Sequence, residues 1–255
     1  MTRRPIRLVA PFLPLAPQNT HHQALADFDW IDAIRMLSHS AELACGRPVQ
    51  VITDAAADMP LPCLRYSTVH RRLMLWVLEA CVRYLESPEF DRDTVCLDCD
   101  QLVGQDLSRF FAPRVDLGLL VRPDLQHRDT WKKVINGVQF WAVGAKACLV
   151  AFYRAALARA EQLPEHLLLW GADTEAIRQL IEPVSVGLHE RCGLRVHLID
   201  EARVSRALTQ DQIDGMHRGV APQFTHAVMD FRYRRKCYMR HVYEMSVLSQ
   251  VPACA

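Results

Sequence analysis

An alternation of apolar strands with an amphipathic helix is the feature that most constrains how this chain can fold. From residue 69 to residue 85 the large apolar side chains recur at helical spacing and fall on one stripe, which predicts a helix packed against a sheet. Apolar segments at 48–54, before this helix, and at 94–103, after it, are typical of strands. Strand, helix and strand in this order predict an α/β fold with a mostly parallel central sheet flanked by helices.

Later segments continue the alternation. Apolar periodicity predicts strands at 6–10, 115–121 and 134–141 and helices at 146–163 and 172–181. Gly137 follows Asn136 inside one of these strands, and a glycine there usually marks a bulge or a close approach of the backbone. Half of the 255 residues are apolar, which is enough for one core, so we expect a single domain over residues 1–255.

The charge and the cysteine content narrow the class of protein. Thirty basic and 29 acidic residues leave a net charge of +1, so the composition as a whole does not favour binding to nucleic acid or to membranes. The nine cysteines are scattered through predicted helices and strands, which favours a reducing compartment. The basic and apolar start resembles a signal peptide, but prolines at positions 11, 14 and 17 interrupt it. No stretch reaches the roughly 20 apolar residues of a membrane span, and we expect a cytoplasmic protein.

Two carboxylates, Asp98 and Asp100, close the apolar run that starts at residue 94. In an extended segment alternate side chains share a face, so both should point the same way from the end of a buried strand. Ligands of open α/β sheets bind beyond the carboxyl ends of the strands. Mg²⁺ and Mn²⁺ typically use one or two carboxylates and fill their other positions with water and phosphate oxygens. The pair therefore predicts a cation site beside a diphosphate, with an ordinary acidic loop as the alternative.

Several short motifs follow one another in the order found in a known enzyme family. With the aspartate pair as the first of them, the chain resembles nucleotide-sugar-dependent glycosyltransferases of the GT-A fold, the retaining type most closely. The matching segments are 97–100, 106–111, 116–122, 135–138, 171–175 and 226–232. The resemblance covers roughly residues 49–236. It implies a nucleotide and metal half at about 1–112 and an acceptor-side half at about 113–255.

The resemblance also implies a metal site. In the family, a strand ending in Leu-Asp-x-Asp holds Mn²⁺ against the donor's diphosphate, and a late His-x-x-Gly-x-x-Lys motif adds a metal ligand and a phosphate-binding cation. Asp98, Asp100 and His226 are therefore the expected ligands of Mn²⁺ or Mg²⁺. Arg232 takes the place of the motif's lysine and can still bind phosphate, with Lys236 as a nearby substitute.

Residues for donor binding and catalysis follow from the same resemblance. Arg72 stands where the family has a basic residue that contacts donor phosphate, and Asp98 and Gly137 are expected beside the donor. Asn136 is expected at a sugar hydroxyl. Asp173 is expected to stabilise the positive charge that develops on the anomeric carbon, or to orient the acceptor hydroxyl. The alternatives without a role in catalysis are that Arg72 is an exposed arginine, Asn136 is part of an Asn-Gly turn and Asp173 is a carboxylate in the first turn of a helix.

The resemblance thus predicts a metal-dependent glycosyltransferase that moves a sugar from a nucleotide diphosphate-sugar to an acceptor hydroxyl, with retention. It favours a UDP-sugar as the donor. A nucleic-acid acceptor is one alternative, because the segment 231–240 mixes basic and aromatic residues. A non-catalytic nucleotide-sugar-binding protein is a second.

Two further alternatives concern other chemistry. A sugar-phosphate nucleotidyltransferase would also need a nucleotide and a metal, but such enzymes have a glycine-rich basic loop after the first strand, where this chain reads Pro-Phe-Leu-Pro at 11–14. A structural zinc site would take its four ligands from Cys96, Cys99, His189 and Cys192. Cys96 and Cys99 are three residues apart, so on a strand they would face opposite sides.

Overall fold

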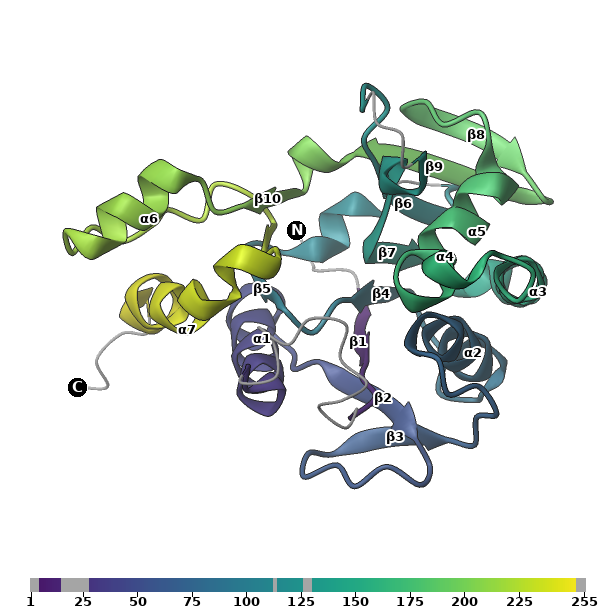
Figure 1. Ribbon diagram of the computed structural model, residues 1–255, viewed down its shortest axis with the longest axis horizontal. Helices are drawn as coiled ribbons and strands as arrows, with labels where there is room; N and C mark the ends of the chain where they lie inside the picture. The colour runs from purple at the N-terminus through teal and green to yellow at the C-terminus, as the bar shows by residue number, and fades with distance from the viewer. Residues whose placement is uncertain (1–4, 15–27, 112–113, 126–129, 251–255) are drawn as a thin grey trace.

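The computed structural model describes residues 5–14, 28–111, 114–125 and 130–250, and its centre is one large mixed sheet (Figure 1). The strands lie in the order β3 (Cys63–Tyr66), β2 (Gln50–Asp54), β1 (Arg7–Pro11), β4 (Thr94–Leu97), β7 (Val134–Trp141), β6 (Leu117–Val121), β9 (Leu194–Asp200) and β8 (Gly187–Arg191). Only β7 and β8 run against the other six. This confirms the α/β fold with a mostly parallel sheet that the sequence predicts.

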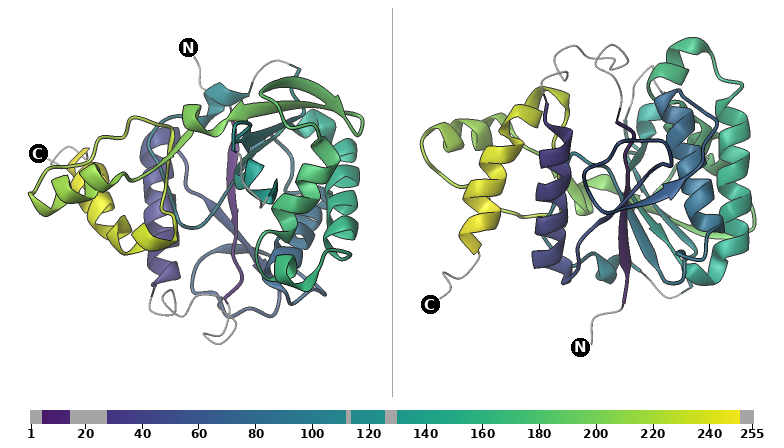
Figure 2. Two further views of the ribbon diagram at one scale, coloured as in Figure 1. Left: turned by 45° about the horizontal axis from the view of Figure 1, so that its top comes forward. Right: turned by 90° about the horizontal axis from the view of Figure 1, so that it is seen from below.

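Helices cover both faces of this sheet. On one face lie α2 (Leu73–Glu86), α3 (Lys146–Ala160), α4 (Glu165–Leu169) and α5 (Ala172–Ile181), and on the other lies α1 (Trp30–Cys45). Figure 2 shows α1 and α2 on opposite sides of the sheet. The stripe predicted on α2 is buried, with Trp76 and Tyr84 fully covered by the core. Burial of one apolar stripe on each helix is what holds these layers together.

A second, three-stranded sheet joins the C-terminal part of the chain to the middle of the fold. It has the order β10 (Ser205–Ala207), β11 (Val228–Asp230) and β5 (Gln101–Val103). In the antiparallel pair of β11 and β5, Asp230 lies opposite Gln101. Helices α6 (Gln210–His217) and α7 (Met239–Val242) accompany this sheet, with α7 beside α1 (Figure 2).

The remaining elements are short helical segments of three to six residues. They are Leu107–Phe110, Thr130–Lys133, Val143–Ala145, Glu201–Arg203, Tyr233–Tyr238, Tyr243–Val247 and Leu248–Gln250. The first of these follows the aspartate pair, and Asp106 caps it by accepting a hydrogen bond from the backbone N–H of Ser108 at 2.9 Å. Within the described residues, no helix is both long enough and apolar enough to cross a membrane.

Two predicted elements differ from the structure. The expected strand 94–103 is broken, because β4 belongs to the large sheet and β5 to the small one, so the chain turns at residues 98–100. Asp98 and Asp100 therefore lie in a turn and not on one face of a strand. The expected helix 69–85 begins only at Leu73, since the backbone N–H groups of Val69 and His70 bind the buried carboxylate of Glu79 instead.

Candidate active site

Four aspartates lie near enough to the carboxyl end of β4 for their charges to interact. Asp98 and Asp100 lie in the turn after this strand, Asp173 lies in the first turn of α5, and Asp230 ends β11. The side chain of Asp98 reaches solvent on one side, yet protein atoms crowd the rest of it. This burial, and then the charges of Asp100, Asp230 and Asp173, raise the pKa of Asp98 well above its usual value. Such mutual repulsion is typical of a site that receives a cation.

Asp230 is the functional candidate that sequence reasoning missed. Burial and the charge of Asp100 raise its pKa to about 6. The backbone N–H of Phe231 donates to the backbone oxygen of Asp100 at 3.2 Å, which fixes the end of β11 beside the turn. A signal was present in the sequence, because Asp230 precedes Lys236 by the same six residues that separate His226 from Arg232.

Lys236 and Arg232 contact this cluster through carboxylates. The Nζ atom of Lys236 lies 2.5 Å from Oδ2 of Asp100 and 4.7 Å from the ring centre of Trp30, and the side chain is buried. Arg232 donates from Nη2 to Oε1 of Glu201 at 3.0 Å, and its Nε lies 3.6 Å from Oδ2 of Asp230. Both cations therefore lie at the aspartates, as ion-pair partners.

Strand β7 bulges toward the aspartates at Asn136 and Gly137. The pairing of β7 with β6 shifts between Leu119 and Leu120, as the Asn-Gly pair predicts. The backbone oxygen of Gly137 accepts the N–H of Asp98 at 2.9 Å. A Cβ atom at residue 137 would lie 3.0 Å from Oδ2 of Asp98 and 2.6 Å from Nε2 of Gln101. A side chain at residue 137 would have to displace the ends of the Asp98 and Gln101 side chains, so the predicted close approach of the backbone is confirmed.

Asn136 and Asp173 form a direct pair. Nδ2 of Asn136 donates to Oδ2 of Asp173 at 2.9 Å. Asp173 is buried, which raises its pKa, while the bond from Asn136 acts in the opposite direction. The amide nitrogen of Asn136 is thereby engaged, and its Oδ1 is buried without a hydrogen-bond partner among the described residues. Oε1 of Gln101 is likewise buried without a hydrogen-bond partner among the described residues.

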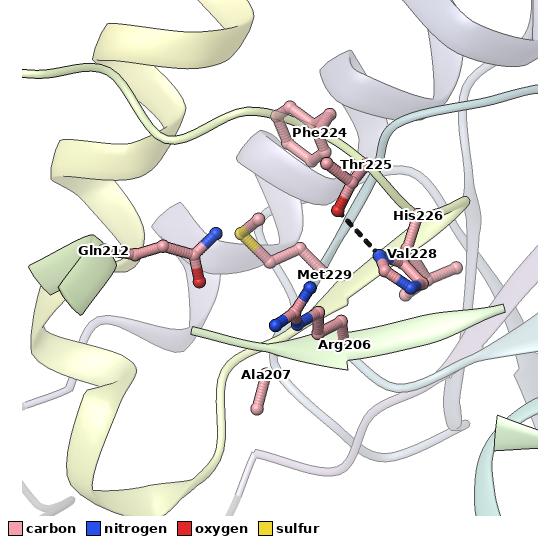
Figure 3. A pocket seen from close by; sticks show the side chains of 8 residues that line it. All are labelled: Arg206, Ala207, Gln212, Phe224, Thr225, His226, Val228 and Met229. Carbon is pink, nitrogen blue, oxygen red and sulfur yellow. Dashed lines mark hydrogen bonds between the residues drawn. The ribbon is translucent and has the colours of Figure 1, made fainter. Parts of the chain in front are cut away.

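The structure does not bring His226 or Arg72 to the aspartates. His226 lies beside Gly104, on the far side of β5 from the turn, and its backbone oxygen is 2.9 Å from where a Cβ of Gly104 would be. Its Nδ1 is 2.8 Å from Oγ1 of Thr225 in a small pocket lined by residues of β10, α6, β11 and the loop 224–226 before β11 (Figure 3). Arg72 precedes α2, and its Nη1 lies 2.5 Å from Oε2 of Glu165.

The donor set suits a hard divalent cation. Within the described ranges no three His, Cys, Asp or Glu side chains are placed to hold a metal ion together. A complete protein cage is not what Mg²⁺ or Mn²⁺ requires, since these ions commonly use one or two carboxylates with water and substrate oxygens. Asp98 and Asp100, whose charges repel, offer such oxygens.

The zinc and nucleic-acid alternatives gain no support from the geometry. Cys96 and Cys99 are buried at β4 and in the turn after it, whereas His189 and Cys192 lie in the β8–β9 hairpin at the edge of the sheet, with β7 and β6 between β4 and that hairpin. In the segment 231–240, Arg232, Lys236 and Arg240 are paired with carboxylates, the last of them with Asp32. Their charges are thus largely compensated within the protein.

Comparisons with known proteins place the fold. No model of a protein family matches the sequence, and no curated protein matches it. Among solved structures, the chain is similar to a glycosyltransferase involved in the glycosylation of the major capsid of PBCV-1, with a TM-score of 0.55 and 10% sequence identity over 94% of this chain and 98% of that one. Mouse xyloside xylosyltransferase 1 in its apo form also aligns, with a TM-score of 0.49 and 11% identity over 90% and 98% of the two chains. The chain therefore shares its overall fold with the first of these two structures.

Proposed function

We propose that this protein is a glycosyltransferase that moves a sugar from a nucleotide diphosphate-sugar, a UDP-sugar by resemblance, to an acceptor hydroxyl. The observation that carries the proposal is the meeting of Asp98, Asp100, Asp173 and Asp230 with the glycine bulge of β7, within a glycosyltransferase fold. These groups come from segments that are far apart in the sequence. An ordinary acidic loop after β4 would give no reason for this convergence.

The buried acceptor atoms support a ligand rich in hydroxyl groups. Oδ1 of Asn136 and Oε1 of Gln101 have no donor among the described residues, and a buried acceptor without a donor is unfavourable. Sugar hydroxyls donate hydrogen bonds, so a bound donor or acceptor sugar would supply what the Asn136 oxygen lacks. The role proposed for Asn136, which is partly exposed, is thus to bind and orient a hydroxyl group, whereas Gln101 is 2% exposed and lies beneath the site.

A divalent cation, Mn²⁺ or Mg²⁺, is part of the proposal. Asp98 and Asp100 would hold it, and the nearby carboxylate of Asp230 would add negative charge, whereas His226 lies beyond Gly104 and would not take part. When bound, the cation would neutralise negative charge on the departing diphosphate. Arg232 and Lys236 stand at the same cluster as further positive charges for phosphate, whereas Arg72 would have to leave Glu165 to take part.

Asp173 is proposed to act on the transferred sugar. Its carboxylate is oriented by Asn136 and lies close enough to Asp98 to raise the pKa of that residue. A fixed negative charge at this place would stabilise the oxocarbenium character of the anomeric carbon. The retaining outcome, which the resemblance implies, is tested by reading the anomeric configuration of the product by NMR.

The proposal is tested by hydrolysis and transfer with a panel of nucleotide-sugars, with and without Mn²⁺. We expect one donor to turn over in the presence of metal, and Asp98→Asn to reduce that rate on the order of 100-fold. Asp91→Asn is the matched control, because Asp91 is an exposed aspartate at the opposite end of the sheet, paired with Arg7 and Arg92.

Each other outcome has a defined meaning. Tight binding of a donor without turnover would indicate a non-catalytic nucleotide-sugar-binding protein. Release of pyrophosphate from a nucleoside triphosphate and a sugar phosphate would indicate a nucleotidyltransferase. Absence of binding to every donor in the panel would contradict the proposal.

A further inference from the structure

A chain of buried polar side chains runs behind the bulge of β7, from helix α3 to the backbone of Asn136. Tyr153 of α3 and Trp141 of β7 are fully buried, and Gln139 is 3% exposed. Nε1 of Trp141 donates to the hydroxyl oxygen of Tyr153 at 2.8 Å, and the Tyr153 hydroxyl donates to Oε1 of Gln139. Nε2 of Gln139 then donates to the backbone oxygen of Asn136 at 3.1 Å.

Chemistry fixes the direction of every bond in this chain. The indole N–H of Trp141 can only donate, so the oxygen of Tyr153 accepts and its proton is left for Gln139. This holds the Gln139 amide with its NH₂ group toward Asn136. In the reversed orientation two acceptor oxygens would face each other, and the Tyr153 hydroxyl would meet a donor group.

The bond from Gln139 lies where the pairing of β7 with β6 is interrupted. Leu119 of β6 pairs with Gln139, whereas the next residue of β6, Leu120, pairs with Ile135, so residues 136–138 fall out of register with β6. The backbone oxygen of Asn136 consequently takes its donor from a side chain. Directly after it, Gly137 accepts the N–H of Asp98.

We propose that Tyr153 is a positioning residue of the active site. Through Gln139 it holds the bulge 136–138 in the place where Asn136 meets Asp173 and Gly137 meets Asp98. Tyr153 lies in the core and acts only through these neighbours. The consequence for sugar transfer rests on the proposed function, but the effect on the bulge does not.

The test compares Tyr153→Phe with Tyr84→Phe, each of which removes one buried hydroxyl from the same core. The hydroxyl of Tyr84 lies 3.0 Å from Oγ1 of Thr94, at the amino end of β4 and away from the bulge. Hydrogen exchange of the Asp98 backbone N–H is measured by NMR, relative to amides elsewhere in the core. We expect this exchange to be about fivefold faster in Tyr153→Phe, and unchanged relative to the core in Tyr84→Phe.

A second variant, Gln139→Met, removes the donor to Asn136 and leaves Trp141 and Tyr153 paired. It should give the same increase in the exchange rate of the Asp98 backbone N–H. If Tyr153→Phe does not fold, this variant alone tests whether the buried hydrogen bonds hold the bulge. An Asp98 amide that exchanges no faster than the core amides in either variant would overturn the proposal.

Kinetics give an independent reading. Misplacement of Asn136 should lower kcat several-fold and change KM for the donor less, because the proposed phosphate-binding cations Arg232 and Lys236 contact residues outside the bulge. A change in KM alone would count against positioning. If the native protein transfers no sugar, the proposed function fails while the exchange experiment still decides the role of Tyr153.

Discussion

Asp230 carries a pKa of about 6, and this value makes a prediction about stability. Between its unfolded value near 3.8 and about 6 the folded protein binds more protons than the unfolded chain, so Asp230 lowers stability as the pH rises through this range. Asp230→Asn should therefore raise the free energy of unfolding by about 1–2 kcal/mol at pH 7 and change it little near pH 3.5. Urea denaturation at both pH values measures this. An equal gain at both values would show that titration of Asp230 is not the cause.

Gly137 is the position where one added methyl group would interfere most directly with the site. Its Cβ would press on Oδ2 of Asp98 and Nε2 of Gln101. We expect Gly137→Ala to lower donor turnover by about tenfold or more and stability by about 1–3 kcal/mol. Gly144→Ala is the control, because a Cβ there meets nothing within 4 Å. Turnover and thermal midpoints of both variants are compared, and equal turnover would contradict a role of Gly137 in placing Asp98.

The segment that leads into α2 is held by a buried carboxylate, which gives a prediction at the scale of an element. His70 binds Glu79 through Nδ1 and Glu161 through Nε2, both at 2.8 Å. Burial alone would lower the pKa of His70, but these two carboxylates raise it above its usual value. The stabilisation is therefore complete below about pH 6.5 and is lost as the pH rises through the raised pKa.

The variant His70→Gln tests the contribution of these two contacts, to Glu79 and Glu161, to stability. It should lower the free energy of unfolding on the order of 1 kcal/mol at pH 6 and have a smaller effect at pH 9. Urea unfolding at the two pH values provides the measurement. The prediction is wrong if the loss is as large at pH 9 as at pH 6.

The same elements show what a sequence can and cannot reveal. The apolar spacing of the sequence predicts the helix Ala172–Ile181, and Gly137 predicts the bulge of β7. The start of α2 cannot be predicted from the sequence, because it depends on which backbone N–H groups donate to the buried carboxylate of Glu79. The turn at 98–100 is hidden as well, since an apolar run does not say that its two ends join different sheets.

At the scale of the whole molecule, the candidate site is an assembly of distant segments. Asp98 can be recognised in the sequence because it follows an apolar run. Asp230 lies near it only because β11 pairs with β5, which is more than 100 residues away in the sequence. Lys236 reaches Asp100 by the same route. Such pairing is decided by packing of the complete chain, and local patterns carry little information about it.

This assembly predicts how the molecule responds to a divalent cation. An ion that binds Asp98 and Asp100 only in the folded protein stabilises it by mass action, by about 2.7 kcal/mol at 100 times the dissociation constant. Mn²⁺ should therefore raise the thermal midpoint of the native protein and of Asp91→Asn, which alters an exposed aspartate at the amino end of the sheet. The rise should be largely lost in Asp98→Asn, whose own stability without metal should be higher, because the repulsion that raises the pKa of Asp98 is gone. An equal rise in all three proteins would mean that Mn²⁺ binds elsewhere. Because this experiment needs neither a donor nor an acceptor, it tests the cation site apart from the transferase activity.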